Sequence, residues 1–234
     1  MSYFQNTKFV PYRFGTSEEY AFHQDITAYV DIVDRVRENN SFYQRYTILD
    51  GDRPDVLSQK IYGSPKYYWT FFLMNDPIRE NGWPTTFQRL EEIAQKERPN
   101  TVLTTRSDLT GIFKVGSTVT GTTSGATGRV IRRRLELGQI IIEGTQAFLS
   151  TEDIQETVGS VTNSVTLVGA VEEYNAIYEY VDADLVPTDI DPYTGPGAQL
   201  AGVTYLDRYI RENDALKDII VIKPSVISSV FEQF

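Results

Sequence analysis

The side chains that could perform chemistry in this 234-residue chain are few and scattered. The chain has no cysteine, which excludes disulfides, thiolate metal sites and cysteine nucleophiles. Its single histidine, His23, stands in a polar context without a neighbouring nucleophile, and one histidine cannot supply a His-rich metal site. We therefore interpret His23 as a surface or structural residue.

Two further clusters resemble ligand sites. Gly121, Gly125 and Gly128 have the density of a phosphate-binding loop, but the Gly-Lys-Ser/Thr ending is missing and no helix start follows. Turn glycines between strands explain them better. Four aspartates between residues 182 and 191 could hold a cation, yet Pro187 stands where an EF-hand requires glycine. Neither cluster predicts a cofactor or a metal site.

The basic run Arg132-Arg133-Arg134 is the one concentration of positive charge. In a strand its side chains alternate between the two faces, so they cannot present three charges on one side. The run predicts a solvated edge that discourages sheet pairing. Docking to an acidic partner is the alternative.

Paired carboxylates such as Glu91-Glu92 could in principle serve acid–base catalysis. A glycosidase needs two carboxylates held across a sugar cleft, and nothing in the sequence indicates one. The pair fits the solvent-exposed face of a helix whose inward residues are Phe87, Leu90 and Ile93. The sequence therefore lacks a set of catalytic residues, and we expect no enzyme activity.

The overall charge limits the classes of binding partner that we expect. The formal net charge of −10 should repel phosphate backbones and anionic membranes, so we expect neither nucleic acid nor a membrane surface. No apolar run approaches the roughly 20 residues of a membrane span. The segment Met1–Phe4 lacks a charged region followed by an apolar stretch, so we expect no signal peptide and assembly in a cytoplasm.

Composition and punctuation divide the chain into four predicted regions: an N-terminal arm and helix at 1–45, a helix-rich module at 46–98, a β-rich module at 101–182, and a closing segment at 183–234. The first region is irregular before an amphipathic helix indicated by Ile26, Tyr29, Val30, Val33 and Val36. The last begins as a Pro- and Gly-rich loop to about residue 202.

Alternating runs in the third region predict short strands. These are Ile112–Val115, Gly128–Leu135, Gln139–Glu143 and Ser164–Val168. In the last region we expect a helix near 205–213, a strand at Ile219–Ile222, and an amphipathic turn after Pro224.

Residues that typically form turns or begin and end helices are frequent between positions 46 and 74. A β-favouring run ends at the turn Asp50-Gly51, after which Asp52 can cap a helix with Pro54 in its first turn. Gly63 is well placed as the left-handed residue that ends this helix. The sequence therefore predicts a strand, a turn and a helix.

A second helix is predicted over residues 65–74, capped by Ser64 and stopped at Asn75. It is apolar on every side, so it must be covered on every side. A module of about 40 residues has little interior to offer, so one face must dock onto the rest of the chain or onto a partner. The candidate interface residues are Tyr67, Tyr68, Trp69, Phe71, Phe72, Trp83, Val230 and Phe231.

These residues carry a family resemblance. Tyr46-Thr47-Ile48 and Asp50-Gly51-Asp52, followed by two short helices, resemble a LysM module. More specifically, the chain resembles the baseplate wedge family of contractile-tailed phages, which in the T-even-like phages is gene product 53. The segments that carry this likeness are Arg53–Leu57, Ile61–Pro65, Tyr68-Trp69, Met74–Asp76, Gly82–Pro84 and Ile219–Ser225.

The resemblance implies an α+β fold: a LysM-like helix-rich N-terminal module, an inserted small all-β module, and a short α/β C-terminal segment. It implies a non-enzymatic virion protein that joins baseplate wedges into a six-fold ring, present in several copies. The implied partners are wedge and ring proteins, including a sheath-like wedge protein and the tail tube hub.

Two other functions stay open at this point. Many LysM modules bind peptidoglycan or chitin, so a carbohydrate-binding module is the alternative, and a cell-wall hydrolase with an accessory LysM is a third reading. If the baseplate reading holds, Trp69→Ala or Phe72→Ala should impair wedge assembly more than any charge change in the β-rich module.

Overall fold

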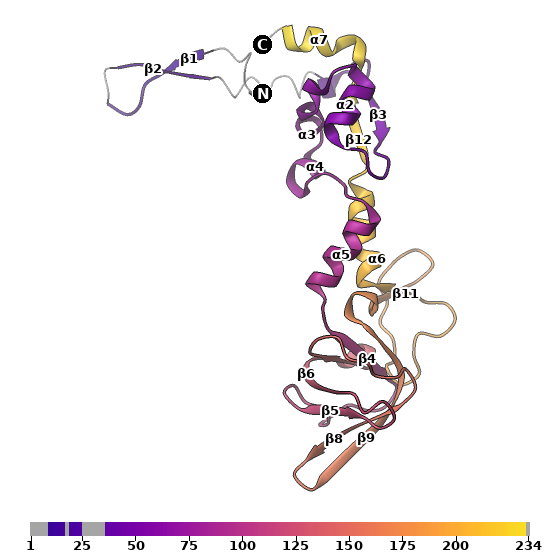
Figure 1. Cartoon of the computed structure of the whole chain (residues 1–234). Helices are drawn as coiled ribbons and strands as arrows, with labels where there is room; N and C mark the ends of the chain where they lie inside the picture. Colours follow the sequence, from indigo (N-terminus) through magenta and orange to yellow (C-terminus); the bar gives the residue numbers. More distant parts are fainter. Residues whose placement is uncertain (1–8, 17–18, 25–35, 233–234) are drawn as a thin grey trace. The chain divides into compact units, whose positions relative to one another are not determined.

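The computed structural model of the chain describes residues 9–16, 19–24 and 36–232 (Figure 1). The chain divides into two compact units: unit 1 comprises residues 1–86 and 213–234, and unit 2 comprises residues 87–212. Unit 2 is thus inserted into the sequence of unit 1. The predicted module 46–98 ends twelve residues inside unit 2, and the closing segment 183–234 is shared between both units.

Unit 1 is built from short elements. Its strands are β1 (Phe9–Tyr12), β2 (Ala21–Gln24), β3 (Tyr43–Thr47) and β12 (Asp218–Ile222). Its helices are α2 (Pro54–Tyr62), the 3-10 turn η1 (Pro65–Tyr67), α3 (Trp69–Met74), α4 (Asp76–Asn81) and α7 (Pro224–Glu232).

Local signals place most of these helix ends. Pro54 occupies the first turn of α2, and Gly63 ends that helix in the left-handed conformation at φ 70°. Ser64 accepts a hydrogen bond from the Lys66 amide and starts η1. The prediction that Asp52 caps α2 is wrong: Arg53 holds the capping position, and the Asp52 carboxylate accepts from the Leu49 amide.

Two apolar clusters hold unit 1 together around the antiparallel pair β3–β12. One cluster joins Leu57 of α2 and Phe71 of α3 to Ile219 and Val221 of β12. The other gathers around four buried side chains, Val36, Met74, Ile222 and Ile227. Residues 43 and 222, which pair in this sheet, are far apart in sequence, so long-range contacts complete the unit.

Unit 2 is dominated by a closed six-stranded barrel with the strand order β4-β7-β6-β5-β8-β9 (Figure 1). Its strands are β4 (Thr101–Thr105), β5 (Thr118–Gly121), β6 (Thr127–Arg134), β7 (Gln139–Ile142), β8 (Asp153–Val158) and β9 (Val161–Glu172). The remaining elements are α5 (Phe87–Glu97), the 3-10 turns η2 (Leu135–Leu137) and η3 (Glu173–Asn175), the pair β10 (Ile177–Val181) and β11 (Ala201–Thr204), and α6 (Tyr205–Ala215), whose last turn belongs to unit 1.

Large apolar side chains fill the barrel. Leu103, Phe113, Ile140 and Ile154 are all fully buried in it. Gly128 is required where the chain passes this core, since a Cβ there would lie 2.1 Å from a methyl carbon of Ile142. Because the sheet is closed, each of these six strands has a paired neighbour on both sides over part of its length.

The predicted fold class is wrong in its main feature. The structure is mixed but strand-rich, with 29% helix and 33% strand, and its N-terminal part is not a helix-rich module. The physical reason is the brevity of the helices: α3 and α4 have six residues each and are separated by Asn75, so they cannot bury one another. Strands supply the missing cover.

Most of the individual helices and strands that were predicted outside this module are confirmed. Strands β6, β7 and β9 confirm three of the four predicted runs, whereas Ile112–Val115 is a turn. The C-terminal helix, strand and helix are confirmed as α6, β12 and α7. The predicted helix at 26–36 lies outside the described residues except for Val36, which is buried.

Candidate functional site

The carboxylates singled out for chemistry serve the fold. In the aspartate-rich loop, Asp182 accepts from the amides of Asp184 and Val186, and Asp191 accepts from the Tyr193 amide. These contacts are turn geometry. Across residues 9–16, 19–24 and 36–232, no three acidic or histidine side chains converge to hold a metal ion.

His23 lies on β2 opposite Val10. Its ring contacts Phe14 edge-on at 5.1 Å between centroids, and Tyr12 at 6.3 Å. It is therefore part of an aromatic group on the hairpin, in agreement with a structural role. In the helix α5, Glu92 pairs with Arg89, as expected for a solvated face, but Phe87 is 52% exposed and does not point inward as predicted.

The glycine-rich segment is a hairpin turn held by a buried carboxylate. Gly125 sits in the turn at φ 67°, between β5 and β6. Glu152 accepts four hydrogen bonds there: from the Thr123 and Ser124 amides, from the Ser124 hydroxyl, and from the Leu149 amide, at 2.6–3.0 Å. These amides are the donors a phosphate would need, so the carboxylate occupies that role.

The hydrogen bonds to Glu152 also set its pKa. Burial acts to raise the pKa, but the bonds from Ser124, Leu149 and Thr123 outweigh it, and the pKa lies below the ordinary 4.5. A depressed pKa means that this carboxylate stabilises the fold fully above its unfolded value, and that the contribution disappears as the pH falls through the folded value.

We expect Glu152→Gln to lower the free energy of unfolding by about 2 kcal/mol at neutral pH, because an NH2 group in place of either oxygen would face two of the four donors. The deficit should shrink in acid, where the wild-type carboxylate is protonated. Urea unfolding followed by far-UV circular dichroism, from neutral pH to below 4.5, measures this. The exposed Glu143→Gln is the matched control. A deficit of constant size at every pH would contradict the assignment.

The arginine run 132–134 is engaged inside unit 2. It lies on β6, where residues 132–134 pair with β7, whereas the pairing of β6 with β5 covers residues 127–129. The run therefore lies beside an edge as predicted, but its side chains are less solvated than predicted, because all three guanidinium groups are bonded. A register shift between Val130 and Arg132 also breaks strict alternation. In sequence order, the three guanidinium groups donate to the Glu173 carboxylate, the Leu109 carbonyl and the Glu136 carboxylate.

Unit 2 contains two hollows of about 270 Å³ each. This volume lies at or below the lower end of small-molecule sites. One is lined by Thr101, Phe148 and Asn175, and the other by Arg134, Tyr178 and Asp189, among others. In the first hollow the Thr101 hydroxyl donates to the Gly144 carbonyl and not to Glu172, its cross-strand neighbour.

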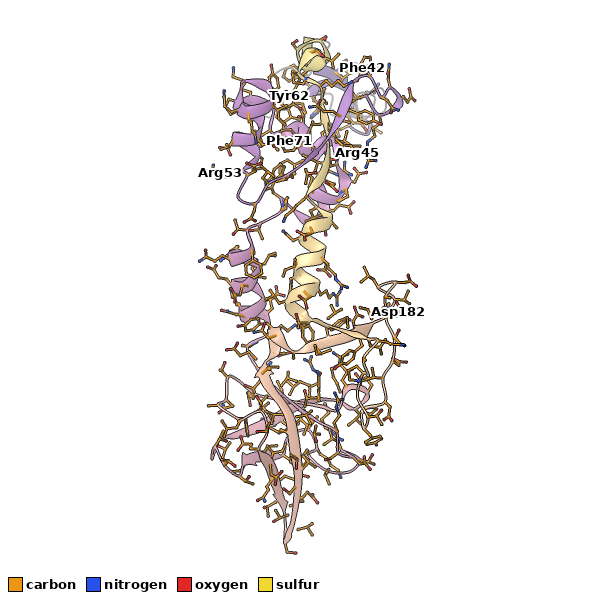
Figure 2. All side chains as sticks on the ribbon, turned by 90° about the vertical axis from the view of Figure 1, so that its right-hand side faces the viewer. Phe42, Arg45, Arg53, Tyr62, Phe71 and Asp182 are labelled. Carbon is orange, nitrogen blue, oxygen red and sulfur yellow. The ribbon has the colours of Figure 1, made fainter. Side chains whose placement is uncertain are left out.

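Of the predicted interface residues, Phe71 is completely buried. It stacks on Tyr62 at 5.9 Å between ring centroids and contacts Trp83 at 5.9 Å, and Phe72 contacts Trp83 at 5.7 Å (Figure 2). The Trp83 indole donates to the Asp52 carbonyl at 2.7 Å. Unit 1 therefore covers this face of α3 itself.

The other predicted interface residues are more open. Tyr67 is half-buried and packs against the cluster around Met74, and Trp69 is also half-buried. Tyr68 is 38% exposed and offers the most surface of the aromatic residues on η1 and α3. Val230 and Phe231 lie on α7, but their side chains fall outside the part of the chain that the structure describes.

The outer edge of β12 is closed by side chains. The Asn75 amide donates to the Ile220 carbonyl at 2.8 Å and accepts from the Ile220 amide at 2.7 Å, which reproduces the pairing of a neighbouring strand. Its nitrogen also donates to the Phe71 carbonyl. The Tyr62 hydroxyl donates to the Ile222 carbonyl at 2.9 Å, and burial raises the pKa of Tyr62 to about 12.

The outer edge of β3 has no such closure. Backbone bonds join Phe42 to Lys223 and Ile48 to Lys217, so the even-numbered residues of this strand face β12. By the alternation of an antiparallel ladder, residues 43, 45 and 47 direct their N–H and C=O groups outward. Within the described residues no backbone or side-chain group pairs with that row.

An exposed aromatic hairpin is the surface that the sequence analysis missed. Among the strands that the structure describes, β1 and β2 pair only with each other, and β1 is exposed along its whole length. Five aromatic side chains of the hairpin are 57% to 69% exposed: Phe9, Tyr12, Phe14, Tyr20 and Phe22. The signal was present as alternating aromatics on both sides of the turn at Gly15, but Pro11 made the segment look irregular.

No protein-family model matches the chain, and no curated protein gives a significant match to it. No helix within the described ranges is long and apolar enough to cross a membrane. Function therefore has to be argued from the surfaces of the molecule and from the residues that carry the baseplate resemblance.

Proposed function

We propose that this chain is a structural component of a contractile phage tail baseplate, where it joins wedges into the ring through protein–protein contacts. The observation that carries the proposal is the hairpin 9–24, which exposes five aromatic side chains. Contiguous exposed apolar surface of this kind marks interaction sites in folded proteins. Aromatic residues are also the usual anchors of protein interfaces.

Two buried carboxylates of unit 2 are engaged within the fold, which supports a role in binding over one in catalysis. Glu152 is saturated by hydrogen bonds from a turn. Glu173 is buried and accepts from Arg132 at 2.5 Å and from Asn100 at 2.6 Å. Buried charges that are fully paired in this way stabilise a fold and are not free to exchange protons with a substrate.

The segments that carry the baseplate resemblance support the tail assignment, because they lie together in unit 1. Arg53–Leu57 starts α2, and Ile61–Pro65 contains its Gly63 end. Met74–Asp76 contains the asparagine whose side chain closes β12, and Ile219–Ser225 contains β12 itself. The segments that carry the resemblance therefore belong to one folding unit and include its long-range strand pairing.

The test is to locate the chain in tails of a phage that encodes it. We expect purified tails to contain it, and we expect a phage with this gene deleted to accumulate wedges without closed baseplates. Binding of the pure chain to purified peptidoglycan is measured in parallel. Saturable binding to peptidoglycan, together with its absence from tails, would favour the carbohydrate-binding alternative and overturn the proposal.

A further inference from the structure

Within the residues that the structure describes, the hairpin 9–24 lacks a third strand or a covering surface, and the outer edge of β3 lacks a pairing strand, so each could supply what the other lacks. A two-stranded hairpin is marginally stable alone in water and gains stability from a third strand or a covering surface. In this hairpin both faces are apolar: Phe9 and Phe22 lie on one face, and Val10 and Tyr12 on the other. Such a ribbon resembles an internal strand pair of a larger sheet.

The edge of β3 is a ready template for another strand. Residues 43, 45 and 47 present outward N–H and C=O groups that no described group pairs with. The opposite edge of the same sheet is closed by Asn75 and Tyr62, so β3 is the side on which this sheet can grow. Figure 2 marks Arg45 on this strand.

Charge favours the same pairing. Arg45 forms no salt bridge with a described carboxylate, and the Lys60 ammonium bonds to the Tyr46 hydroxyl at 3.1 Å instead of to an acid. Among the outward-directed residues 43, 45 and 47 the charged one is Arg45, and at the end of this row Asp218 of β12 accepts from the Thr47 hydroxyl; the chain as a whole has a net charge of −10. The hairpin segment carries two glutamates and one arginine, so its sequence has the opposite sign.

We propose that β2 of one copy of this chain adds to the outer edge of β3 of a second copy. β2 is the better strand for this purpose, because all four of its residues carry an N–H whereas β1 contains Pro11. Aromatic side chains of the hairpin that come to lie against the neighbouring copy add apolar contact to this backbone pairing, since a fully buried aromatic side chain covers roughly 150 to 250 Å².

The contact joins two different surfaces, so it runs head to tail. Each copy offers one hairpin and one edge, and such an interface generates a ring if the rotation closes and a filament if it does not. This inference goes beyond the proposed function and does not depend on it. If the pairing fails, the chain can still join wedges through other proteins.

The experiment uses two variants of the full chain, each of which blocks one of the two contact surfaces. Arg45→Pro removes the central outward N–H of β3, and Phe22→Lys places a positive charge on the hairpin, which Arg45 of β3 repels. Sedimentation velocity over a wide concentration range should show wild-type self-association. Each variant alone should associate at least about tenfold more weakly. Arg45→Thr, which keeps the N–H, separates the loss of charge from the loss of pairing.

Mixing the two variants gives the decisive readout. Arg45→Pro retains an intact hairpin and Phe22→Lys retains an intact edge, so an equimolar mixture should form a one-to-one dimer that cannot extend. Phe22 is exposed, so its variant should fold even if Arg45→Pro does not, and it must then be monomeric by itself. A wild-type chain that stays monomeric, association that neither variant weakens, or a mixture without dimer would each overturn the proposal.

Discussion

Replacing Asn75 by aspartate should lower the free energy of unfolding of unit 1 by about 4 kcal/mol, although the two side chains have nearly the same shape. Asn75 is buried and donates to the carbonyls of Phe71 and Ile220, at 2.8 Å each. A carboxylate has no donor for these carbonyls and would place a charge against them. The loss would be a large fraction of the stability of a small domain.

Urea unfolding followed by tryptophan fluorescence measures this change selectively, because both tryptophans of the chain, Trp69 and Trp83, lie in unit 1. Asn81→Asp is the matched control. Asn81 is exposed, and its amide donates to the Pro77 carbonyl at 3.0 Å, so its replacement should cost less than about 1 kcal/mol. Equal losses for the two variants would show that Asn75 does not close the β12 edge.

The parts of the fold that short stretches of chain determine were predictable from sequence. Gly63 adopts the left-handed conformation, Ser64 caps the next turn, and α3 ends at Asn75, as the residue types predict. Each outcome depends on backbone sterics or on a hydrogen bond within a few residues. The capping by Asp52 failed for the same local reason, because its carboxylate bonds instead to the Leu49 amide.

The parts that depend on distant partners were not predictable. The sheet of unit 1 pairs Thr47 with Asp218, and nothing near either residue specifies the other. For this reason the helices between them looked like a helix-rich module, when strands from both ends of the chain supply much of their cover. The bonds that hold the arginine run on β6 were not predictable for the same reason, since Glu173, the partner of Arg132, is 41 residues away.

The outcomes for the aromatic residues show the same difference between local signals and distant partners. Sequence identified Phe71 and Tyr68 as members of one apolar helix that required cover. It could not say that β12 and Trp83 would cover Phe71 and leave Tyr68 more exposed, because β12 lies far along the chain: its Ile220 is 145 residues after Asn75. The hairpin 9–24 was missed because exposure of aromatic residues cannot be read from their type.

Replacing Phe71 or Tyr68 by alanine should change the stability of unit 1 by very different amounts. We expect Phe71→Ala to lower the free energy of unfolding of unit 1 by about 3 to 5 kcal/mol, because a fully buried ring would leave a cavity between Tyr62, Trp83 and Ile219. We expect Tyr68→Ala to cost about 1 kcal/mol or less, because its ring is 38% exposed. Urea unfolding with tryptophan fluorescence compares the two directly.

The comparison separates a role in folding from a role in assembly. Because Phe72 packs on Trp83, any assembly defect of Phe72→Ala includes lost stability of unit 1, whereas a defect of Tyr68→Ala at full stability would have to arise at an interface. Tail assembly is therefore scored with Tyr68→Ala beside the exposed control Arg129→Ala in the barrel. If Phe71→Ala proved no more destabilising than Tyr68→Ala, the cover assigned to α3 would be wrong, and the helix would need a partner after all.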